Sequence, residues 1–318
     1  MKRHLFKIAA FFLIVVLLDL ATGMVFSRLT GCARGGDTAR NEYICNKTSE
    51  DILVFGSSRA IHHYNPLIIA DSLGLTCYNC GQDGNGAILN YGRYHLISQR
   101  YHPKVVIYDV MPLYDLLTGE DNRKFLGWLR PYYDRPGIDS VFAWVDPMEK
   151  YKMMSRMYRY NSRFLQILSD CVRPAQEDAL KGFQPIEGTL DTLKINPEVI
   201  ESPQLDSLKI SCLKRMIDEA DATRFVFVVS PYWYGMDDRL IAPLRDLCRQ
   251  RGILLLDFSN DPKYVHNDDY FIDGVHLNAR GADEFTRDLV KRLRQVCAEV
   301  VQDAMSPRLA AISFSKRG

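Results

Sequence analysis

Short apolar runs alternate with helical patterns along most of this 318-residue chain, and this alternation restricts the fold more than any other feature. The runs are rich in Val, Ile, Leu and Phe, as is typical of parallel strands that are covered on both faces. They predict strands at 51–56, 76–79, 104–109, 224–230 and 253–258. Helices are expected at 66–73, 87–101, 205–220, 237–251 and 279–304. The pattern predicts an α/β fold with a mostly parallel five-stranded sheet between layers of helices.

Residues at about 113–204 interrupt this rhythm. The segment is rich in aromatic and Met residues, contains scattered Pro, and has few strand-like runs. We predict a mostly helical insertion in a domain of residues 51–304, followed by a C-terminal tail at 305–318. The aromatic and Met side chains either form the insertion's own core, which we favour, or belong to a roof over a site on the main domain.

The N-terminus combines positive charge with a long apolar stretch. Lys7 and Asp19 are the charged positions in residues 5–26, and further positive charges precede this stretch. About 20 apolar residues suffice to cross a bilayer as a helix, and positive charge before the helix favours a chain that lies outside the cytoplasm. We predict a membrane anchor at 1–27 and a polar linker at 28–50. The main domain of this single-pass cell-membrane protein is then periplasmic or at the cell surface.

Two features of the anchor leave alternatives open. A cleaved signal peptide is the second interpretation, although residues 21–23 offer only a weak cleavage site. Asp19 is costly in hydrocarbon, so we expect it near the outer interface or against another membrane protein.

Cysteine content and net charge set further limits. Eight cysteines in an exported chain permit disulfides, and Cys32 with Cys45 is the pair that we expect. Cys77 and Cys80 have the spacing of a redox or zinc motif, but no second Cys or His pair accompanies them, so we expect no metal. A net charge of +1 gives no basic face of the kind that binds nucleic acid.

The first segment that carries chemistry is Gly56-Ser57-Ser58, directly after the first predicted strand. Glycine permits a sharp turn there, and Ser58 then lies at the carboxyl edge of the sheet, where ligands of such folds bind. If a helix begins nearby, its free N–H groups can stabilise negative charge. The segment alone is weak, because Ser in such turns caps a helix more often than it acts as a nucleophile.

Asp273 and His276 lie between the fifth predicted strand and the last helix. A serine hydroxyl needs a base to take its proton, and histidine suits that role near neutral pH. A carboxylate then holds the imidazole in the correct tautomer. The alternative is an Asp that caps the last helix, beside a His that merely packs.

Gly81, Gly84 and Gly86 follow the second predicted strand. Glycines let backbone N–H groups point at a ligand, and donors aimed at a developing oxyanion are often the largest contribution to acyl transfer. A nucleotide-phosphate loop is disfavoured, because the glycine spacing differs, no Lys-Ser/Thr follows, and Asp83 would repel phosphate. The three segments thus end three strands at one edge of the predicted sheet.

Together they resemble the SGNH, or GDSL-like, hydrolase superfamily. Gly56-Ser57-Ser58 is similar to its first block, Asn79-x-Gly81-x-x-Gly84 to its second, and Asp273-x-x-His276 to its last. The resemblance covers about residues 50–112 and 224–300, and implies a three-layer flavodoxin-like fold with no metal and no organic cofactor. It implies that Ser58 is the nucleophile, His276 the base and Asp273 its orienting acid. The Ser58 and Gly84 amides would form the oxyanion hole.

One block of the family is missing here. The family's third block, Gly-x-Asn-Asp, would supply an Asn donor to the oxyanion hole, but residues 108–112 read Tyr-Asp-Val-Met-Pro. Asn85 is the substitute that we consider. One lost donor costs about 2–4 kcal/mol of barrier, which is compatible with a slow or specialised transfer reaction.

Arg59, Tyr232 and Trp233 are weaker substrate-binding candidates. Arg59 either binds a substrate carboxylate or braces the turn through Asp109. Tyr232 and Trp233 either stack on a sugar or form a hydrophobic plug under the insertion. The neighbouring His62 and His63 are expected at the surface.

The sequence leads to two hypotheses. In the first, the chain is a serine-dependent acyl-ester hydrolase or acyltransferase, and its location favours an acylated, especially O-acetylated, cell-envelope glycan as substrate. In the second, the same fold is a non-catalytic protein that binds a glycan or a membrane acyltransferase partner.

Overall fold

The computed structural model describes residues 1–119, 122–173, 178–195, 197, 200 and 202–294. Its centre is a five-stranded sheet in the order β2-β1-β3-β4-β5, in which every neighbouring pair is parallel. The strands are β1 (Ile52–Phe55), β2 (Cys77–Asn79), β3 (Val105–Asp109), β4 (Arg224–Val229) and β5 (Leu254–Asp257). This strand order is that of flavodoxin-like folds, so the predicted fold class is confirmed.

The two faces of the sheet contact two separate cores. In β1, Leu53 and Phe55 belong to one buried cluster and Ile52 and Val54 to the other, as the two-residue period of a strand requires. Helical residues of Gly36–Asn46, Ala87–Ser98, Ser207–Asp218 and Asp238–Arg251 complete the first cluster. Those of Ser58–His63, Pro66–Leu73 and the last helix complete the second. The result is a three-layer arrangement of helices, sheet and helices.

Among the helices of these layers, those at 66–73, 87–98, 207–218 and 238–251 match predicted helices closely, whereas those at 36–46 and 58–63 were not predicted. The helices are α2 (Gly36–Asn46), α3 (Ser58–His63), α4 (Pro66–Leu73), α5 (Ala87–Ser98), α10 (Ser207–Asp218) and α11 (Asp238–Arg251). Residues 279–294 are also helical. The predicted continuation of this helix to 304 and the tail at 305–318 lie outside the described residues.

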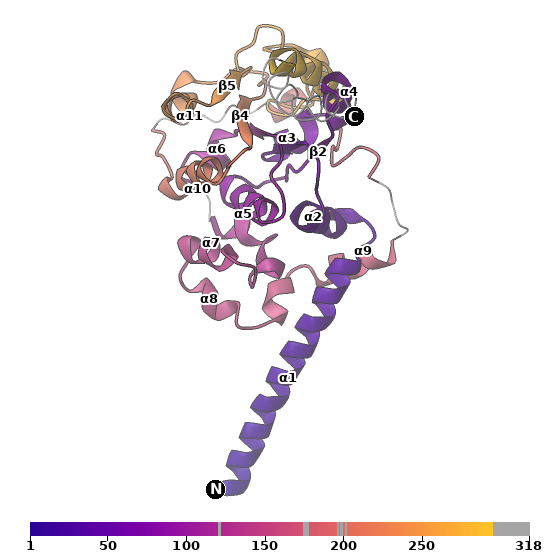
Figure 1. The fold of residues 1–318 in the computed structure, drawn as a ribbon, viewed down its shortest axis with the longest axis vertical. Coiled ribbons are helices and arrows are strands. Elements are labelled where there is room, and N and C mark those ends of the chain that lie inside the picture. The colour runs from indigo at the N-terminus through magenta and orange to yellow at the C-terminus, as the bar shows by residue number, and fades with distance from the viewer. Residues whose placement is uncertain (120–121, 174–177, 196, 198–199, 201, 295–318) are drawn as a thin grey trace, which may run out of the picture.

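The insertion is built from short helices, as expected. They are α6 (Pro112–Asp115), α7 (Ile138–Val145), α8 (Glu149–Lys152) and α9 (Phe164–Val172), with 3-10 helices η1 (Asn122–Leu126), η2 (Arg130–Tyr132), η3 (Met157–Tyr160) and η4 (Thr192–Lys194). Phe125, Tyr132 and Phe142 are buried in the first core cluster, so these aromatic side chains extend the main core rather than form a separate one. Helices α7, α8 and α9 lie at the end of the molecule from which α1 protrudes (Figure 1).

Helix α1 (Lys2–Cys32) is longer than the predicted anchor and stands away from the domain over its N-terminal half (Figure 1). By length and composition it is apolar enough to cross a membrane, a property that signal sequences share. Residues 28–50, which we expected to be a linker, instead contain the end of α1 and helix α2. Ile44 and Cys45 of α2 are fully buried, so the helix packs on the core although most of its residues are polar.

The expected disulfide between Cys32 and Cys45 is not formed. Cys45 is buried in the core, where its Sγ lies 3.9 Å from the side-chain oxygen of Asn41, whereas Cys32 is exposed. Cys32 and Cys45 are both free thiols. The prediction failed because it treated 28–50 as a linker. Helix α2 instead turns Cys45 inward, and burial raises the pKa of its thiol to about 11.

Candidate active site

Ser58 is the first residue of α3 and lies two residues after Gly56, which directly follows β1. Gly56 has φ +145°, a conformation that L side chains rarely adopt. A Cβ there would lie 2.7 Å from the carbonyl oxygen of Asp109 and 2.8 Å from Cβ of Ala60. Glycine is therefore required for the turn that brings α3 close to the end of β3.

The structure brings Ser58, His276 and Asp273 together. Ser58 Oγ lies 2.9 Å from His276 Nε2, and His276 Nδ1 lies 2.8 Å from Asp273 Oδ2. When Asp273 is ionised, Nδ1–H donates to it, which leaves Nε2 to accept the hydrogen bond of the Ser58 hydroxyl. All three residues are only partly buried, so a reactant has access to them.

Asp273 is fixed by its own loop. Its Oδ1 accepts hydrogen bonds from the backbone N–H groups of Val275 (2.8 Å) and His276 (2.7 Å). Burial alone would raise the pKa of Asp273, but the hydrogen bond and charge of His276, together with these N–H groups, hold this pKa below its usual value of 3.8. Asp273 is therefore a carboxylate at neutral pH.

His63 supports the histidine loop from beneath and is not the surface residue that we expected. It is fully buried; its Nε2 accepts a hydrogen bond from the N–H of Leu277 at 3.0 Å, and its Nδ1 lies 3.0 Å from Ser230 Oγ. Its neighbour His62 is also largely buried, and its Nε2 lies 3.1 Å from Asp83 Oδ1. The expectation was wrong because α3 packs against the last loop as well as against the sheet. The sequence held no signal of this second contact.

The loop after β2 is held against α3. The side-chain amide of Asn79 donates to the carbonyls of Ala60 (2.7 Å) and Tyr64 (2.9 Å), and Gln82 N–H donates to Gly56 O at 3.1 Å. A Cβ on Gly81 would lie 2.5 Å from the backbone nitrogen of Ile61, so this close approach needs glycine. The segment of Gly81 and Gly84 is therefore attached directly to α3, the helix that carries Ser58.

Two backbone donors of this region have no partner. Within the part of the chain that the structure describes, the N–H groups of Ser58 and Gly84 donate to no acceptor. Gly84 has φ +62° and nothing within 4 Å of a Cβ position, so its surroundings are open. Asn85, the substitute donor that we considered, is buried. Its side-chain amide donates to Asp83 O at 2.7 Å, within its own loop.

Arg59 and Asp109 form a fully buried pair behind the site. Arg59 Nε lies 3.6 Å from Asp109 Oδ2, and the guanidinium also donates to the hydroxyl and carbonyl of Ser230. Tyr64 O–H donates to Asp109 Oδ1 at 2.6 Å. Neither member of the pair is exposed, so the contacts of Arg59 are those of the bracing alternative, and its guanidinium does not face the surface.

Tyr232 and Trp233 differ in how far they are exposed. Tyr232 is 3% exposed, and its ring lies under the Arg59 guanidinium, 3.5 Å from ring centroid to Cζ. Trp233 is half-buried and its Nε1–H donates to Asp268 at 2.9 Å. The ring of Tyr232 is therefore covered, whereas that of Trp233 is partly open.

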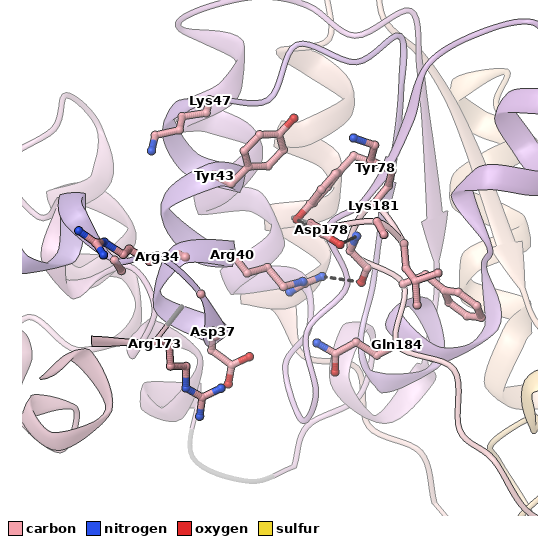
Figure 2. A pocket seen from close by; sticks show the side chains of 18 residues that line it. Arg34, Asp37, Arg40, Tyr43, Lys47, Tyr78, Arg173, Asp178, Lys181 and Gln184 are labelled. Atoms are coloured by element: carbon pink, nitrogen blue, oxygen red, sulfur yellow. Dashed lines mark hydrogen bonds between the residues drawn. The ribbon is translucent and has the colours of Figure 1, made fainter. Parts of the chain in front are cut away.

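Two pockets lie near the predicted residues. One of about 490 Å³ is lined by Asp273, Val275 and Tyr234, with Lys194 and Ile200 contributed by the insertion. Another of about 590 Å³ lies beside α2 and is lined by charged side chains, among them Arg34, Arg40, Lys47, Arg173, Lys181, Asp37 and Asp178 (Figure 2).

His62 lies between the second pocket and the candidate site. Gln184 lines the pocket, and His62 Nδ1 lies 2.6 Å from its carbonyl oxygen. The rings of His62 and His276 are 6.0 Å apart, centroid to centroid.

As for metals, the described residues contain no cluster of three His, Cys, Asp or Glu side chains that is arranged to hold an ion.

No protein-family profile and no curated protein matches the sequence. Among solved structures, the chain is similar to a protein described as a lipolytic protein of the G-D-S-L family from Desulfitobacterium hafniense DCB-2, with 12% identity, 76% of this chain and 98% of the other covered, and a TM-score of 0.37. It is also similar to the periplasmic domain of a lipopolysaccharide acetyltransferase from Salmonella ser. Paratyphi A, with 12% identity, coverage of 84% and 94%, and a TM-score of 0.39. Identities and TM-scores this low carry no conclusion about the reaction of this chain.

Proposed function

We propose that the chain is a serine-dependent acyl-ester hydrolase or acyltransferase. The observation that supports this most strongly is the contact series from Ser58 Oγ to His276 Nε2 (2.9 Å) and from His276 Nδ1 to Asp273 (2.8 Å). Side chains in this order and at these distances activate a hydroxyl, because the imidazole accepts its proton and the carboxylate stabilises the imidazolium that forms. The partly exposed Ser58 hydroxyl is then positioned to attack an ester.

The reaction proceeds in two halves. Ser58 Oγ attacks the acyl carbonyl carbon while His276 takes the hydroxyl proton, and the tetrahedral oxyanion is bound by the N–H groups of Ser58 and Gly84. Collapse breaks the ester bond, and His276 returns the proton to the departing alcohol. In the second half, His276 deprotonates water or a sugar hydroxyl, which attacks the acyl-serine and regenerates Ser58.

The substrate class follows from location. With α1 as an anchor and positive charge before it, the domain lies on the extracytoplasmic side of the cell membrane. Acylated glycans of the cell envelope, O-acetylated ones among them, are the esters that such a domain meets. The pocket that reaches Asp273 gives room of about 490 Å³ for a sugar or acyl group.

Hydrolysis of p-nitrophenyl acetate tests the proposal. Ser58→Ala should reduce turnover to the level of buffer. Ser57→Ala is the matched control, because Ser57 is buried and its hydroxyl contacts Met111 Sδ at 3.6 Å instead of His276. Equal turnover by Ser58→Ala and wild type would remove the mechanism.

A second function, a non-catalytic glycan-binding or acyltransferase-partner protein, is favoured by one observation. The place of the family's third-block Asn is taken by the end of β3, where Asp109 is used in the buried pair with Arg59. No side-chain donor from this strand end is then available to an oxyanion. Covalent labelling of Ser58 discriminates between the two functions.

A further inference from the structure

Seven large apolar side chains are exposed on two segments of the insertion that contact α1. They are Met148, Tyr151, Met154 and Met157 from the α8–η3 segment, and Leu165, Leu168 and Val172 from α9. We call these seven residues the insertion's apolar face. Met154, Leu165 and Val172 are 75%, 82% and 84% exposed. The three α9 residues follow the spacing of one helical face, and apolar clusters of this kind are contact surfaces for a protein or a membrane.

The α8–η3 segment is attached to α1 at Asp19 and Gly23. The Asp19 carboxylate accepts hydrogen bonds from the Ser155 hydroxyl (2.6 Å) and from the N–H groups of Arg156 (2.8 Å) and Met157 (3.1 Å). A Cβ on Gly23 would lie 2.2 Å from Cβ of Arg156, so the two backbones approach closely. Asp19 thus contacts the chain's own insertion, which neither of our expectations for this residue included.

Helix α9 lies against the next turns of α1. The ring of Phe26 is 4.6 Å from that of Phe164, centroid to centroid, and Cys171 Sγ lies 3.1 Å from the carbonyl oxygen of Leu29. Figure 1 shows α9 beside the upper end of α1. The two segments that carry the apolar face therefore contact α1 between residues 19 and 29.

If α1 crosses a bilayer, its length places the part that contacts the insertion, residues 19–29, at least partly within the hydrocarbon core. Residues 5–18, which are exposed except for the partly buried Ala10, span about 21 Å at 1.5 Å per residue, short of a hydrocarbon core of about 30 Å. The apolar sequence continues to Phe26, and residues 5–26 span about 33 Å. On the uncovered side of α1, Leu20, Met24 and Val25 stay exposed. Hydrocarbon must therefore reach the level at which the insertion packs.

We propose that the insertion's apolar face enters the bilayer leaflet in which α1 ends, so that the domain rests in the membrane instead of swinging on its anchor. The inference rests on the proposed membrane location of α1. It also accounts for Asp19, whose carboxylate is costly in hydrocarbon and receives three donors here. The exposed Lys150, Lys152 and Arg173 flank the face, where their charges can reach lipid headgroups.

Lipid quenching of a site-specific fluorophore tests the proposal on the full chain in phospholipid vesicles. Cys32 and Cys171, the described cysteines that are not buried, are first replaced by Ser. A bimane label is then placed by Met154→Cys, Leu165→Cys or Val172→Cys, one at a time. Quenching by phospholipids with a doxyl group on the acyl chain is compared with quenching by aqueous iodide. Each label should lose fluorescence to doxyl lipid and be protected from iodide.

Two further labels make the outcomes decisive. Leu193→Cys is the matched control, because Leu193 is 89% exposed on η4 of the same insertion, and Ile195, two residues further on, approaches Gly274. Its label should be quenched by iodide and not by lipid. Leu13→Cys on α1 reports the anchor. Lipid quenching at 13 without quenching at 154, 165 and 172 overturns the inference alone, whereas none at 13 overturns the anchor and the inference together.

The same labels in native membranes separate lipid from a protein partner. Protection from iodide together with quenching by added doxyl lipid supports the proposal. Protection from both quenchers means that a membrane protein covers the face, and this result overturns the proposal. Turnover of p-nitrophenyl acetate is measured on every labelled protein, so that loss of the ester reaction is recognised separately from a change in membrane contact.

Discussion

His63 Nε2 accepts a hydrogen bond from the backbone N–H of Leu277 at 3.0 Å, one residue after His276. This buried contact joins the helix of Ser58 to the loop of His276, and so sets the distance between the two side chains. His63→Ala should leave the Leu277 N–H unpaired, at a cost of about 1–3 kcal/mol. Melting temperature should fall by about 2–4 °C for each kcal/mol, and kcat for p-nitrophenyl acetate should fall while KM changes little. His63→Gln, which keeps an acceptor, should recover part of kcat. Wild-type kcat in folded His63→Ala would show that His63 does not position His276.

The same residue predicts how stability depends on pH. Burial, reinforced by the positive charge of Arg59 and by the neighbouring His276 and His62, holds the pKa of His63 well below its usual 6.5. The unfolded chain therefore binds a proton below about pH 6.5 that the folded chain does not bind. Stability from neutral His63 is present above this pH and is lost as the pH falls. Urea unfolding between about pH 7 and pH 5 should show a smaller loss in His63→Gln than in wild type. Equal losses in the two proteins would contradict this assignment.

The proposed role of Asp273 is to orient the His276 imidazole, so its replacement should lower the rate. In a Ser–His–Asp triad, the change from Asp to Asn lowers kcat by about 10⁴-fold because the imidazole takes the wrong tautomer. We expect a loss of this order in Asp273→Asn, measured on p-nitrophenyl acetate. Asp269→Asn is the control, since Asp269 is 70% exposed and pairs with Arg280 at 3.3 Å. A comparable rate in the two variants would be inconsistent with the proposed role.

The buried pair of Arg59 and Asp109 should govern stability rather than substrate affinity. Removing one member leaves the other charge buried and unpaired, which typically costs about 3–5 kcal/mol. Asp109→Ala should lower the free energy of unfolding by this amount in urea titrations. Arg280→Ala breaks an exposed pair with Asp269, which is worth about 0–1 kcal/mol, and provides the comparison. Similar effects of the two substitutions would mean that the buried pair is not a structural brace.

Gly81 tests the contact between the loop after β2 and α3. In Gly81→Ala, the new Cβ would meet the Ile61 nitrogen at 2.5 Å, so loop and helix must separate, and ester turnover should fall with stability. Gly74→Ala is the control, because Gly74 has φ +67° and open space around its Cβ position. It should cost about 1–2 kcal/mol through backbone strain alone and leave turnover unaffected. Normal turnover in Gly81→Ala would show that this contact does not position the site.

The sequence was most informative where local patterns decide the structure. Apolar runs predicted all five strands, and the carboxyl-edge rule predicted that Ser58 and His276, 218 residues apart, would lie close together. Their catalytic roles stay predictions. Tertiary contacts were less predictable. Polar α2 was taken for a linker, and nothing near His63 or Arg59 showed that both side chains would be buried. Asp19 meets Ser155 and its neighbours through a contact 136 residues distant, which no local pattern encodes.

The most direct test of the central claim is covalent labelling of the folded full-length protein with a fluorophosphonate probe. Such a probe reacts with a serine whose hydroxyl is activated by a base. We expect a single adduct, located at Ser58 by peptide fragmentation, and its loss in a His276→Ala variant that keeps the wild-type circular dichroism spectrum. Folded wild-type protein that remains unlabelled at Ser58 would contradict the account and favour the non-catalytic function.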